Sequence, residues 1–271
     1  IRMIGEDIKK KSIIIKKGEI INHSHLGILS SCGIKNISVI VKPIVSFFST
    51  GDELISINNK LKKGMIYDSN RYILHGLLER LPVVIKDMGV VKDNEKALIK
   101  KLEVCCQKSD IIITTGGVSV GDADYIKSAL AKLGKIDFWK IAIKPGRPLA
   151  YGKIKKSYFF GLPGNPVSAV VTFQLFVKAA INKLMDVKER KNIMINAITK
   201  DNLSKKKGRV EYKRGYLMQD KNINYVMSSG LQGSNILSSL AKANCYIRLD
   251  VNTSKVNKGD EVTVLPFDIL I

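Results

Sequence analysis

A glycine-rich loop is the first segment of this chain whose residue types and spacing could do chemistry. Residues 110–127, DIIITTGGVSVGDADYIK, lead from an apolar run into two adjacent glycines. Glycines let backbone N–H groups approach a ligand closely, as phosphate-binding loops require, and the helix that follows presents its N-terminus to an anion. This pattern favours a ligand-binding loop over a plain tight turn. The residues expected to bind are Thr115, Gly116, Gly117, Ser119 and Gly121.

Carboxylates stand beside this loop and beside an earlier one. Asp122 and Asp124 follow the glycines, and Asp52 and Glu53 follow the apolar segment 43–50. Carboxylates next to a phosphate loop commonly hold Mg²⁺, which neutralises phosphate oxygens. Asp122 and Asp124 could instead favour the first turn of their helix through its dipole. Because that role would not need both, we favour a magnesium site formed by Glu53, Asp122 and Asp124.

Two lysines flank another strand end, in the stretch FWKIAIKPGRP at 138–148. Lys140 and Lys144 could meet a phosphate or another oxyanion as compact cations, and Arg147 extends the same cationic edge. The alternative is that both lysines are simply solvated in a Lys-rich chain. Their setting between Trp139 and two prolines favours the first interpretation.

A second helix start carries the segment LPGNPVS at 162–168. Asn165 is suited to the N-cap and Pro166 to the first helical position. Capping alone and anion binding stay equally open for this helix start. For Asp93, which precedes the helix expected at 94–107, capping and a functional carboxylate stay equally open. The candidate binding residues here are Pro163, Gly164, Asn165 and Ser168.

Strands and helices that alternate along the chain must position these residues. Near-continuous apolar strands between amphipathic helices predict a mostly parallel sheet with helices on both faces. In such a sheet, ligands bind outside the carboxyl ends of the strands, so the loops above should share one edge. The expected strands are 37–41, 43–50, 83–91, 110–115, 138–143 and 158–162, and the expected helices are 24–34, 69–81, 94–107, 124–133 and 165–185.

The pattern changes from about residue 188. Short, roughly alternating segments separated by Lys, Asn, Gly and Asp turns predict an antiparallel barrel or sandwich of about 80 residues. We therefore expect a short N-terminal segment 1–42, an α/β domain 43–187 and a β-domain 188–271. The segments are IMINAIT, RVEYKRGYLM, NYVMSS, CYIRLDV and DEVTVLPF.

Composition excludes several classes of protein. The net charge is +21, but only 8 of the 45 basic residues are Arg and the lysines are spread along the whole chain, which argues against a nucleic-acid site. No apolar run approaches the roughly 20 residues of a membrane span, and the first residues lack a signal-peptide core. The four cysteines show no pairing or zinc-like spacing with the three histidines. A cytoplasmic protein with reduced thiols is expected.

Several long motifs, taken together, resemble those of the molybdopterin molybdenumtransferases, the MoeA family. They run in the family's order over essentially all 271 residues. The resemblance implies a three-layer αβα molybdopterin-binding domain followed by a C-terminal β-barrel domain. The motifs are STGDELI, GMIYDSNRYIL, DIIITTGGVSVGDADYIK, FWKIAIKPGRPLAYGKI, FFGLPGNPVSAVVTF, GRVEYKRGYL, LQGSNILSSLAKANCYIRL and GDEVTVLPF.

The resemblance also implies a reaction. Adenylylated molybdopterin and molybdate would yield molybdenum cofactor and AMP, with Mg²⁺ assisting. By motif position, the residues tied to activity are Asp7, Glu53, Asp93, Asp124, Lys140 and Lys144. The molybdate-binding residues would be Lys144, Pro145, Arg214 and Ser234, of which the last two are not indicated by any pattern of their own. Arg147 stands where the family more often has Lys.

The chain departs from the family at its front. Members carry a substantial segment before GEDI that helps to form a homodimer, and residues 1–42 resemble only the end of an elongated N-terminal domain. We expect a piece of a longer protein or the product of an interrupted gene. The alternatives to the enzyme are an inactive relic or a pterin-binding scaffold and, less favoured, the molybdopterin adenylyltransferase, which is also a conceivable partner. Preference for molybdate over tungstate is left open.

Overall fold

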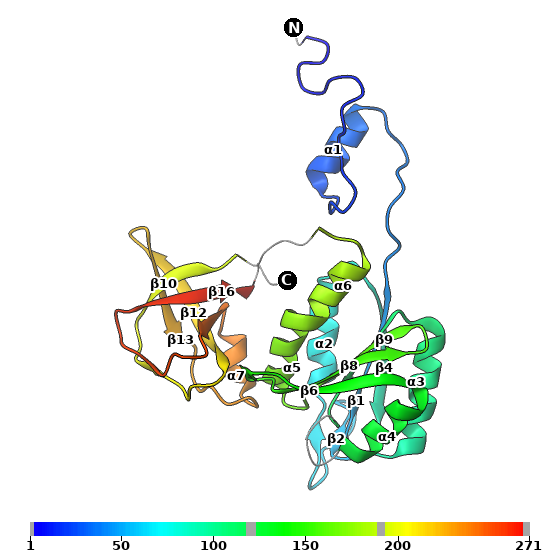
Figure 1. Ribbon diagram of the computed structural model, residues 1–271, viewed down its shortest axis with the longest axis vertical. Helices are drawn as coiled ribbons and strands as arrows, with labels where there is room; N and C mark the ends of the chain where they lie inside the picture. Colours follow the sequence, from blue (N-terminus) through cyan, green and yellow to red (C-terminus); the bar gives the residue numbers. More distant parts are fainter. Residues whose placement is uncertain (1–2, 118–122, 189–192, 268–271) are drawn as a thin grey trace.

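Two bodies and an N-terminal arm make up the molecule. The structure is a computed structural model that describes residues 3–117, 123–188 and 193–267. An α/β domain packs beside a β-barrel, and the arm projects beyond them (Figure 1). It touches the end of the α/β domain where Gly18 O accepts the N–H of Lys188 at 3.1 Å. The arm contains helix α1 (His23–Ser31), which Asn22 caps by accepting a hydrogen bond from the N–H of His25.

The segment 37–41, predicted as a strand, is extended but joins no sheet among the described residues. No strand in the described part of the chain pairs with it, and its apolar side chains are exposed, with Val41 86% exposed. An apolar run with β propensity forms a strand only where another strand can pair with it. The expectation of a strand here was therefore wrong.

The α/β domain is built on a six-stranded sheet that is mostly parallel, as the sequence predicted. Strands β4, β1, β5 and β9 pair in parallel, and β8 pairs antiparallel with both β9 and β6. Because β8 runs against both of its neighbours, β6 ends at the same edge as β9. The order is β4 (Val84–Val91), β1 (Ile44–Thr50), β5 (Ile111–Thr115), β9 (Ser157–Leu162), β8 (Pro148–Ile154) and β6 (Gly134–Lys140).

Helices cover both faces of this sheet. On one face lie α2 (Asn70–Glu79) and a long helix made of α5 (Pro166–Thr172), the π-helical η1 (Phe173–Val177) and α6 (Lys178–Leu184). The other face carries α3 (Glu95–Lys108) and α4 (Ala123–Leu133). Phe47 packs into the first layer and Phe48 into the second, as the period-2 alternation of a strand requires.

The helix Pro166–Leu184 has the length and apolar composition of a membrane span, the one such case in the described ranges. More than half of it is buried inside the protein. Val167, Phe173 and Val177 are completely or almost completely buried. Its apolar character is therefore that of a core helix between the sheet and the barrel.

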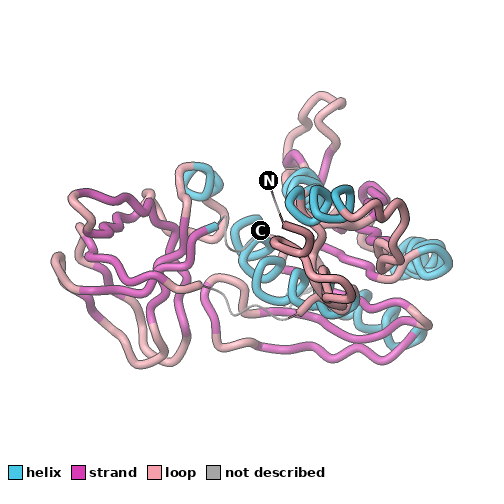
Figure 2. Tube along the Cα trace, turned by 90° about the horizontal axis from the view of Figure 1, so that it is seen from above, coloured by secondary structure: helices cyan, strands magenta, loops and turns pink. Residues whose placement is uncertain are grey.

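The C-terminal domain is a closed five-stranded barrel, which Figure 2 shows as a ring. Most pairs are antiparallel, but β10 and β13 run parallel, which a purely antiparallel expectation missed. A core of Val226, Cys245, Ile247 and Val264 fills the interior. The barrel strands are β13 (Ile223–Ser228), β10 (Ile195–Thr199), β16 (Glu261–Pro266), β14 (Cys245–Leu249) and β12 (Val210–Asp220), accompanied by α7 (Leu237–Ala241), β11 (Leu203–Ser204) and β15 (Lys255–Val256).

The two domains share a strand. The two-residue strand β7 (Ile143–Lys144) belongs to the α/β part of the chain but pairs in parallel with β12 of the barrel. The segment predicted as one strand at 138–143 is thus divided between two sheets. A buried hydrogen bond, from Tyr246 Oη to Gln174 Oε1 at 2.7 Å, joins β14 to the long helix. These contacts fix the barrel against the strand edge where the candidate site was expected.

Candidate active site at the junction of the two domains

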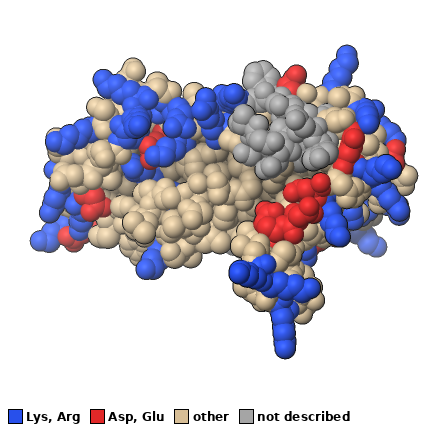
Figure 3. Space-filling model, turned by 90° about the horizontal axis from the view of Figure 1, so that it is seen from below, with Lys and Arg blue, Asp and Glu red and all other residues tan. Residues whose placement is uncertain are grey.

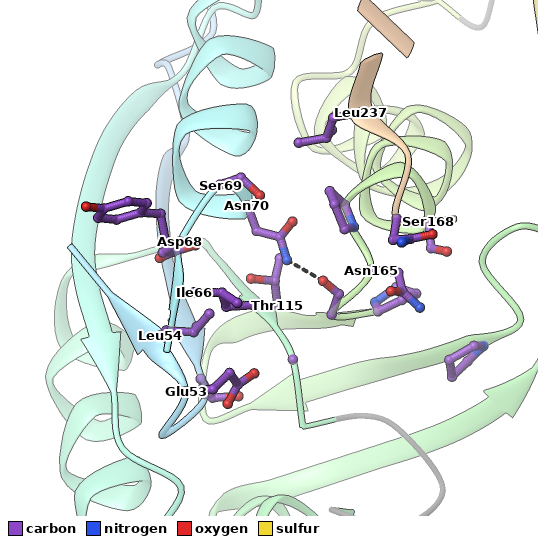
Figure 4. Close-up of a pocket in the computed structure, with 18 residues that line it drawn as sticks. Glu53, Leu54, Ile66, Asp68, Ser69, Asn70, Thr115, Asn165, Ser168 and Leu237 are labelled. Atoms are coloured by element: carbon purple, nitrogen blue, oxygen red, sulfur yellow. Dashed lines mark hydrogen bonds between the residues drawn. The ribbon is translucent and has the colours of Figure 1, made fainter. Parts of the chain in front are cut away.

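A cavity of about 500 Å³ opens where the strand ends meet the barrel. Its size is within the usual range for a site that binds a small organic molecule. Figure 4 shows that side chains from both domains converge on it. It is lined by Thr50, Glu53, Leu54, Ile66, Tyr67, Asp68, Ser69, Asn70, Thr115, Gly116, Pro148, Pro163, Gly164, Asn165, Pro166, Ser168, Asn235 and Leu237.

The glycine loops allow three chain segments to pack closely at this edge. Gly116 has φ +90°, and a Cβ there would collide with the carbonyl oxygen of Thr50. A Cβ on Gly164 would lie 3.5 Å from the Cα of Gly116. The N–H of Gly116 donates to Leu162 O at 3.3 Å, so this amide is engaged within the protein. Gly116 therefore allows the close approach of the loops after β1, β5 and β9.

The turn into α2 forms a wall of the cavity that our sequence reasoning did not assign. It follows the short pair β2 (Leu54–Ile55) and β3 (Ile66–Tyr67). Below it, the Ser49 hydroxyl donates to Asp68 Oδ1 at 3.1 Å and lies 3.0 Å from Thr115 Oγ1. The Asn70 amide donates to Gly164 O at 2.7 Å, as Figure 4 shows. The polar run DSN inside a family motif was the signal that could have revealed this wall.

Among the predicted carboxylates, Glu53 borders the cavity. Its side chain folds back over Gly51, where a Cβ would lie 2.7 Å from Glu53 Oε2. Beside it, Asp52 Oδ1 accepts a hydrogen bond from the N–H of Asp93 at 3.2 Å. The loops after β1 and β4 are therefore in contact, as predicted for a common edge.

Asp93 is not the cap of the helix it precedes. Asn94 holds the N-cap position of α3, and its Oδ1 accepts the N–H of Ala97 at 2.8 Å. The capping interpretation of Asp93 was therefore wrong, because the cap lies one residue later. Asp93 makes its contact with the loop that carries Glu53 instead.

The proposed magnesium ligands lie only partly within the described chain. Asp124 falls in the first turn of α4, but its side chain is outside the described residues, and Ser119, Gly121 and Asp122 lie outside them entirely. Gly117 is the last described residue of that loop. Within the described ranges no group of three or more His, Cys, Asp or Glu could hold a metal ion. The carboxylate of Glu53, at the cavity, has the oxygen chemistry that Mg²⁺ prefers.

The predicted basic pair lies next to the cavity rather than in its lining. Lys140 stands opposite Pro148, a lining residue, in the β6–β8 register. Lys144 Nζ lies 3.2 Å from Glu211 Oε1, and the side chain is 49% exposed. Close packing places the intervening loop against α5, since a Cβ on Gly146 would lie 2.7 Å from Thr172 Cγ2. Pro145 is buried in the same loop.

Arg214 occupies a very different environment, with only 1% exposure. Its guanidinium donates to three carbonyls of the loop 231–233 and to Ser239 Oγ. Burial lowers its pKa, while Tyr246 and Glu211 raise it. The next residue of the loop, Ser234, accepts the N–H of Val167 at 3.0 Å through its carbonyl. Arg214 thus holds in place the barrel loop that brings Asn235 and Leu237 to the cavity.

Surface charge agrees with the scattered lysines of the sequence. Lys and Arg cover both ends of the face in Figure 3, with uncharged surface between them. A group of Asp and Glu side chains gathers right of the centre of this face. The N-terminal arm, which carries Asp7, projects beyond both domains in Figure 1, and Asp7 is not a cavity residue.

Comparison with known proteins decides the family. Residues 46–183 match the family described as a probable molybdopterin binding domain, and residues 196–267 match the MoeA C-terminal region (domain IV). The chain is 42% identical to a molybdopterin molybdenumtransferase of Haemophilus influenzae, covering all of this chain and 68% of that protein. This chain belongs to the MoeA family of molybdopterin molybdenumtransferases.

Other relatives agree on family and fold. A molybdopterin molybdenumtransferase of Staphylococcus aureus is 30% identical over 98% of this chain and 64% of its own length. The crystal structure of a molybdopterin biosynthesis MoeA protein from Pyrococcus horikoshii superimposes with a TM-score of 0.83 at 30% identity, covering 97% of this chain and 64% of that one. The chain spans about two thirds of the length of these relatives.

Proposed function

We propose that this chain carries the site at which molybdenum from molybdate is inserted into adenylylated molybdopterin, with release of AMP and formation of molybdenum cofactor. The observation that carries this proposal is the shared cavity. Loops after β1, β5 and β9 meet a barrel loop there, in a chain 42% identical to a molybdenumtransferase. The barrel, which matches the MoeA C-terminal region, favours this reaction over adenylylation of molybdopterin.

In this proposal the residues divide into three groups. The lining residues Thr115, Gly116, Pro163, Gly164, Asn165 and Ser168 contact the adenylylated pterin. Glu53, with Asp122 and Asp124, would hold Mg²⁺, which when bound supplies positive charge to the pyrophosphate oxygens. Lys140 and Lys144 attract molybdate as half-solvated cations at the side of the cavity.

The barrel takes part through its loop. Ser234 stands in the loop held by Arg214, so Arg214 acts by positioning that loop rather than by offering its own buried charge. Pro145 lies buried beside Lys144 and fixes the loop that carries it. Asp93 supports Glu53 through its backbone bond to Asp52.

Incubation of the protein with adenylylated molybdopterin, molybdate and Mg²⁺ tests the proposal. AMP should appear in proportion to molybdenum cofactor. Asp124→Asn should lower the rate about 100-fold if this carboxylate holds Mg²⁺, the order expected for an electrostatic catalytic group. Asp137→Asn, at an exposed carboxylate on β6, is the control. Binding of the pterin without AMP release would contradict the enzyme and support a scaffold.

We also propose that the protein acts as a homodimer. The N-terminal arm exposes a row of large apolar side chains, among them Ile37, Val39 and Val41. A contiguous apolar strip of this kind is more typical of an interface than of a free surface. Light scattering should give twice the chain mass, and a monomer at micromolar concentration would contradict the proposal.

A further inference from the structure

Three buried oxygen atoms at the cavity have no hydrogen-bond partner among the described residues. They are Thr50 Oγ1, Asp68 Oδ2 and Asn70 Oδ1. All three residues line the cavity, and Asp68 is only 2% exposed. Arg71 Nη1 lies 3.9 Å from Asp68 Oδ2, which is too far for a hydrogen bond. An unpaired buried acceptor costs free energy unless a ligand supplies a donor.

Two other polar atoms of the α2 turn, Asn70 Nδ2 and Asp68 Oδ1, are engaged within the protein. Asn70 Nδ2 donates to Gly164 O, and a flipped amide would bring two carbonyl oxygens together. The Oδ1 atom of Asp68 accepts from Ser49 Oγ and from the N–H of Arg71. The turn therefore leaves two acceptors for a ligand in the cavity, Asp68 Oδ2 and Asn70 Oδ1. The Ser69 hydroxyl, which also lines the cavity, can donate or accept beside them.

These acceptors form an unsuitable surface for the two anionic parts of the substrates. Pyrophosphate and molybdate carry negative charge and accept hydrogen bonds, so a carboxylate repels them. A pterin ring is different, since its aminopyrimidine edge presents an amino group next to a ring N–H. Leu54, Ile66 and Leu237 lie in the same lining and offer apolar surface to a flat ring.

We propose that Asp68 and Asn70 recognise the donor edge of the pterin ring and so fix which end of the substrate lies against α2. This inference rests on the proposed function and names the ring-binding wall of the same cavity. The phosphates and the incoming molybdate then lie toward the loops after β5 and β9 and toward Lys144. The specificity comes from pairing, because a ring that lacks the 2-amino group leaves one of the two acceptors buried and unpaired.

Fluorescence titration with two ring analogues tests the inference. The probes are 6-hydroxymethylpterin and 6-hydroxymethyllumazine, which differ in that the 2-amino donor is replaced by a carbonyl acceptor. The protein should bind the pterin at least about tenfold more tightly than the lumazine. Asp68→Asn and Asn70→Ala should reduce that preference to about threefold or less.

Asp87→Asn is the matched control. Asp87 is the other carboxylate that contacts Arg71, at 2.9 Å from Nε, and it does not line the cavity. This variant should keep the tenfold preference. If Asp87→Asn loses it as completely as Asp68→Asn does, the effect comes from Arg71 and the inference is overturned.

Other outcomes separate this inference from the proposed function. Equal affinity of the unmodified protein for both rings, or an Asp68→Asn variant that keeps the preference, overturns it. A further titration uses Mg²⁺ alone. If Asp68→Asn abolishes Mg²⁺ binding but keeps the preference for the pterin, Asp68 binds a metal and the inference is overturned. Absence of AMP release with an intact ring preference contradicts only the reaction. If circular dichroism shows Asp68→Asn unfolded, Asn70→Ala decides.

Discussion

Two cations that the sequence assigned to the same ligand occupy opposite environments. Lys144 is half exposed beside the cavity and shares Glu211 with Lys213. Arg214 is almost completely buried, and its guanidinium donates hydrogen bonds to three backbone carbonyls and one serine hydroxyl. A lysine ammonium at a surface can exchange its partner for a ligand at little cost. A buried guanidinium that satisfies several carbonyls stabilises the fold, because its removal leaves all of them unpaired.

Removal of Arg214 should give the largest effect on stability. We expect Arg214→Met to lower the free energy of unfolding by about 3 kcal/mol or more, since buried carbonyls of the loop 231–233 lose their donors. Urea unfolding measures this. Arg209→Met, a less buried arginine of the same domain, should change stability by about 0.5 kcal/mol at most. Equal losses of unfolding free energy in the two variants would contradict the distinction between a buried cation that stabilises the fold and an exposed one that does not.

Removal of Lys144 should instead reduce activity. Lys144→Met is expected to lower AMP release about 100-fold and to change the free energy of unfolding by about 0.5 kcal/mol or less. Lys213→Met breaks an ion pair with the same Glu211 oxygen and should keep the rate within about twofold. If Lys144→Met releases AMP at the rate of the unmodified protein, Lys144 has no role in the reaction despite its exposure beside the cavity.

The hydrogen bond between the domains should have an intermediate effect on stability. Tyr246→Phe leaves Gln174 Oε1 buried without its donor, for a loss of about 1–2 kcal/mol in the free energy of unfolding. Burial also raises the pKa of Tyr246, so the hydroxyl stays protonated as a donor. Tyr158→Phe, at an exposed tyrosine of β9, is the control in the same urea experiment. Similar midpoints for both variants would contradict this role.

The smallest effect should come from an exposed ion pair. Hydrogen bonds from Lys132 and Ser128 lower the pKa of Glu95 in the folded protein. The carboxylate therefore stabilises the fold above its ordinary pKa, and this contribution is lost as the pH falls through the lowered value. Glu95→Gln should reduce the urea midpoint slightly at pH 7 and hardly at pH 3. Glu103→Gln, at an exposed position of the same helix, is the control, and at pH 7 the midpoint should fall further in Glu95→Gln than in this variant.

Much of the site was predictable from local pattern. The apolar strand IIITT and the glycines after it predicted that Gly116 would lie at a strand edge, and the same rule brought Glu53, Gly164 and Asn165 to that edge. These predictions succeeded because strand direction follows from alternation of strands and helices. Asn165 also takes the N-cap position, with Pro166 in the first helical turn.

The rest depended on contacts between distant parts of the chain. Asp68 and Asn70 look like ordinary helix-start residues until Ser49 and Gly164 are placed beside them. Arg214 looks like any basic residue on a strand, because the loop 231–233 that buries it lies farther along the chain. The strand β7 has only two residues, too few to show a periodic pattern. Its pairing with β12 of the barrel was therefore not predicted.

That shared strand has a consequence for exchanging parts between family members. Lys144 belongs to one domain by sequence and to the other by main-chain pairing with Glu211. A barrel transplanted from a relative at residue 188 would have to accept β7 of its host, and a mismatch would displace Lys144 while leaving the cavity residues of the α/β domain in place. Chimaeras should therefore be joined so that 143–144 and 210–211 come from the same parent.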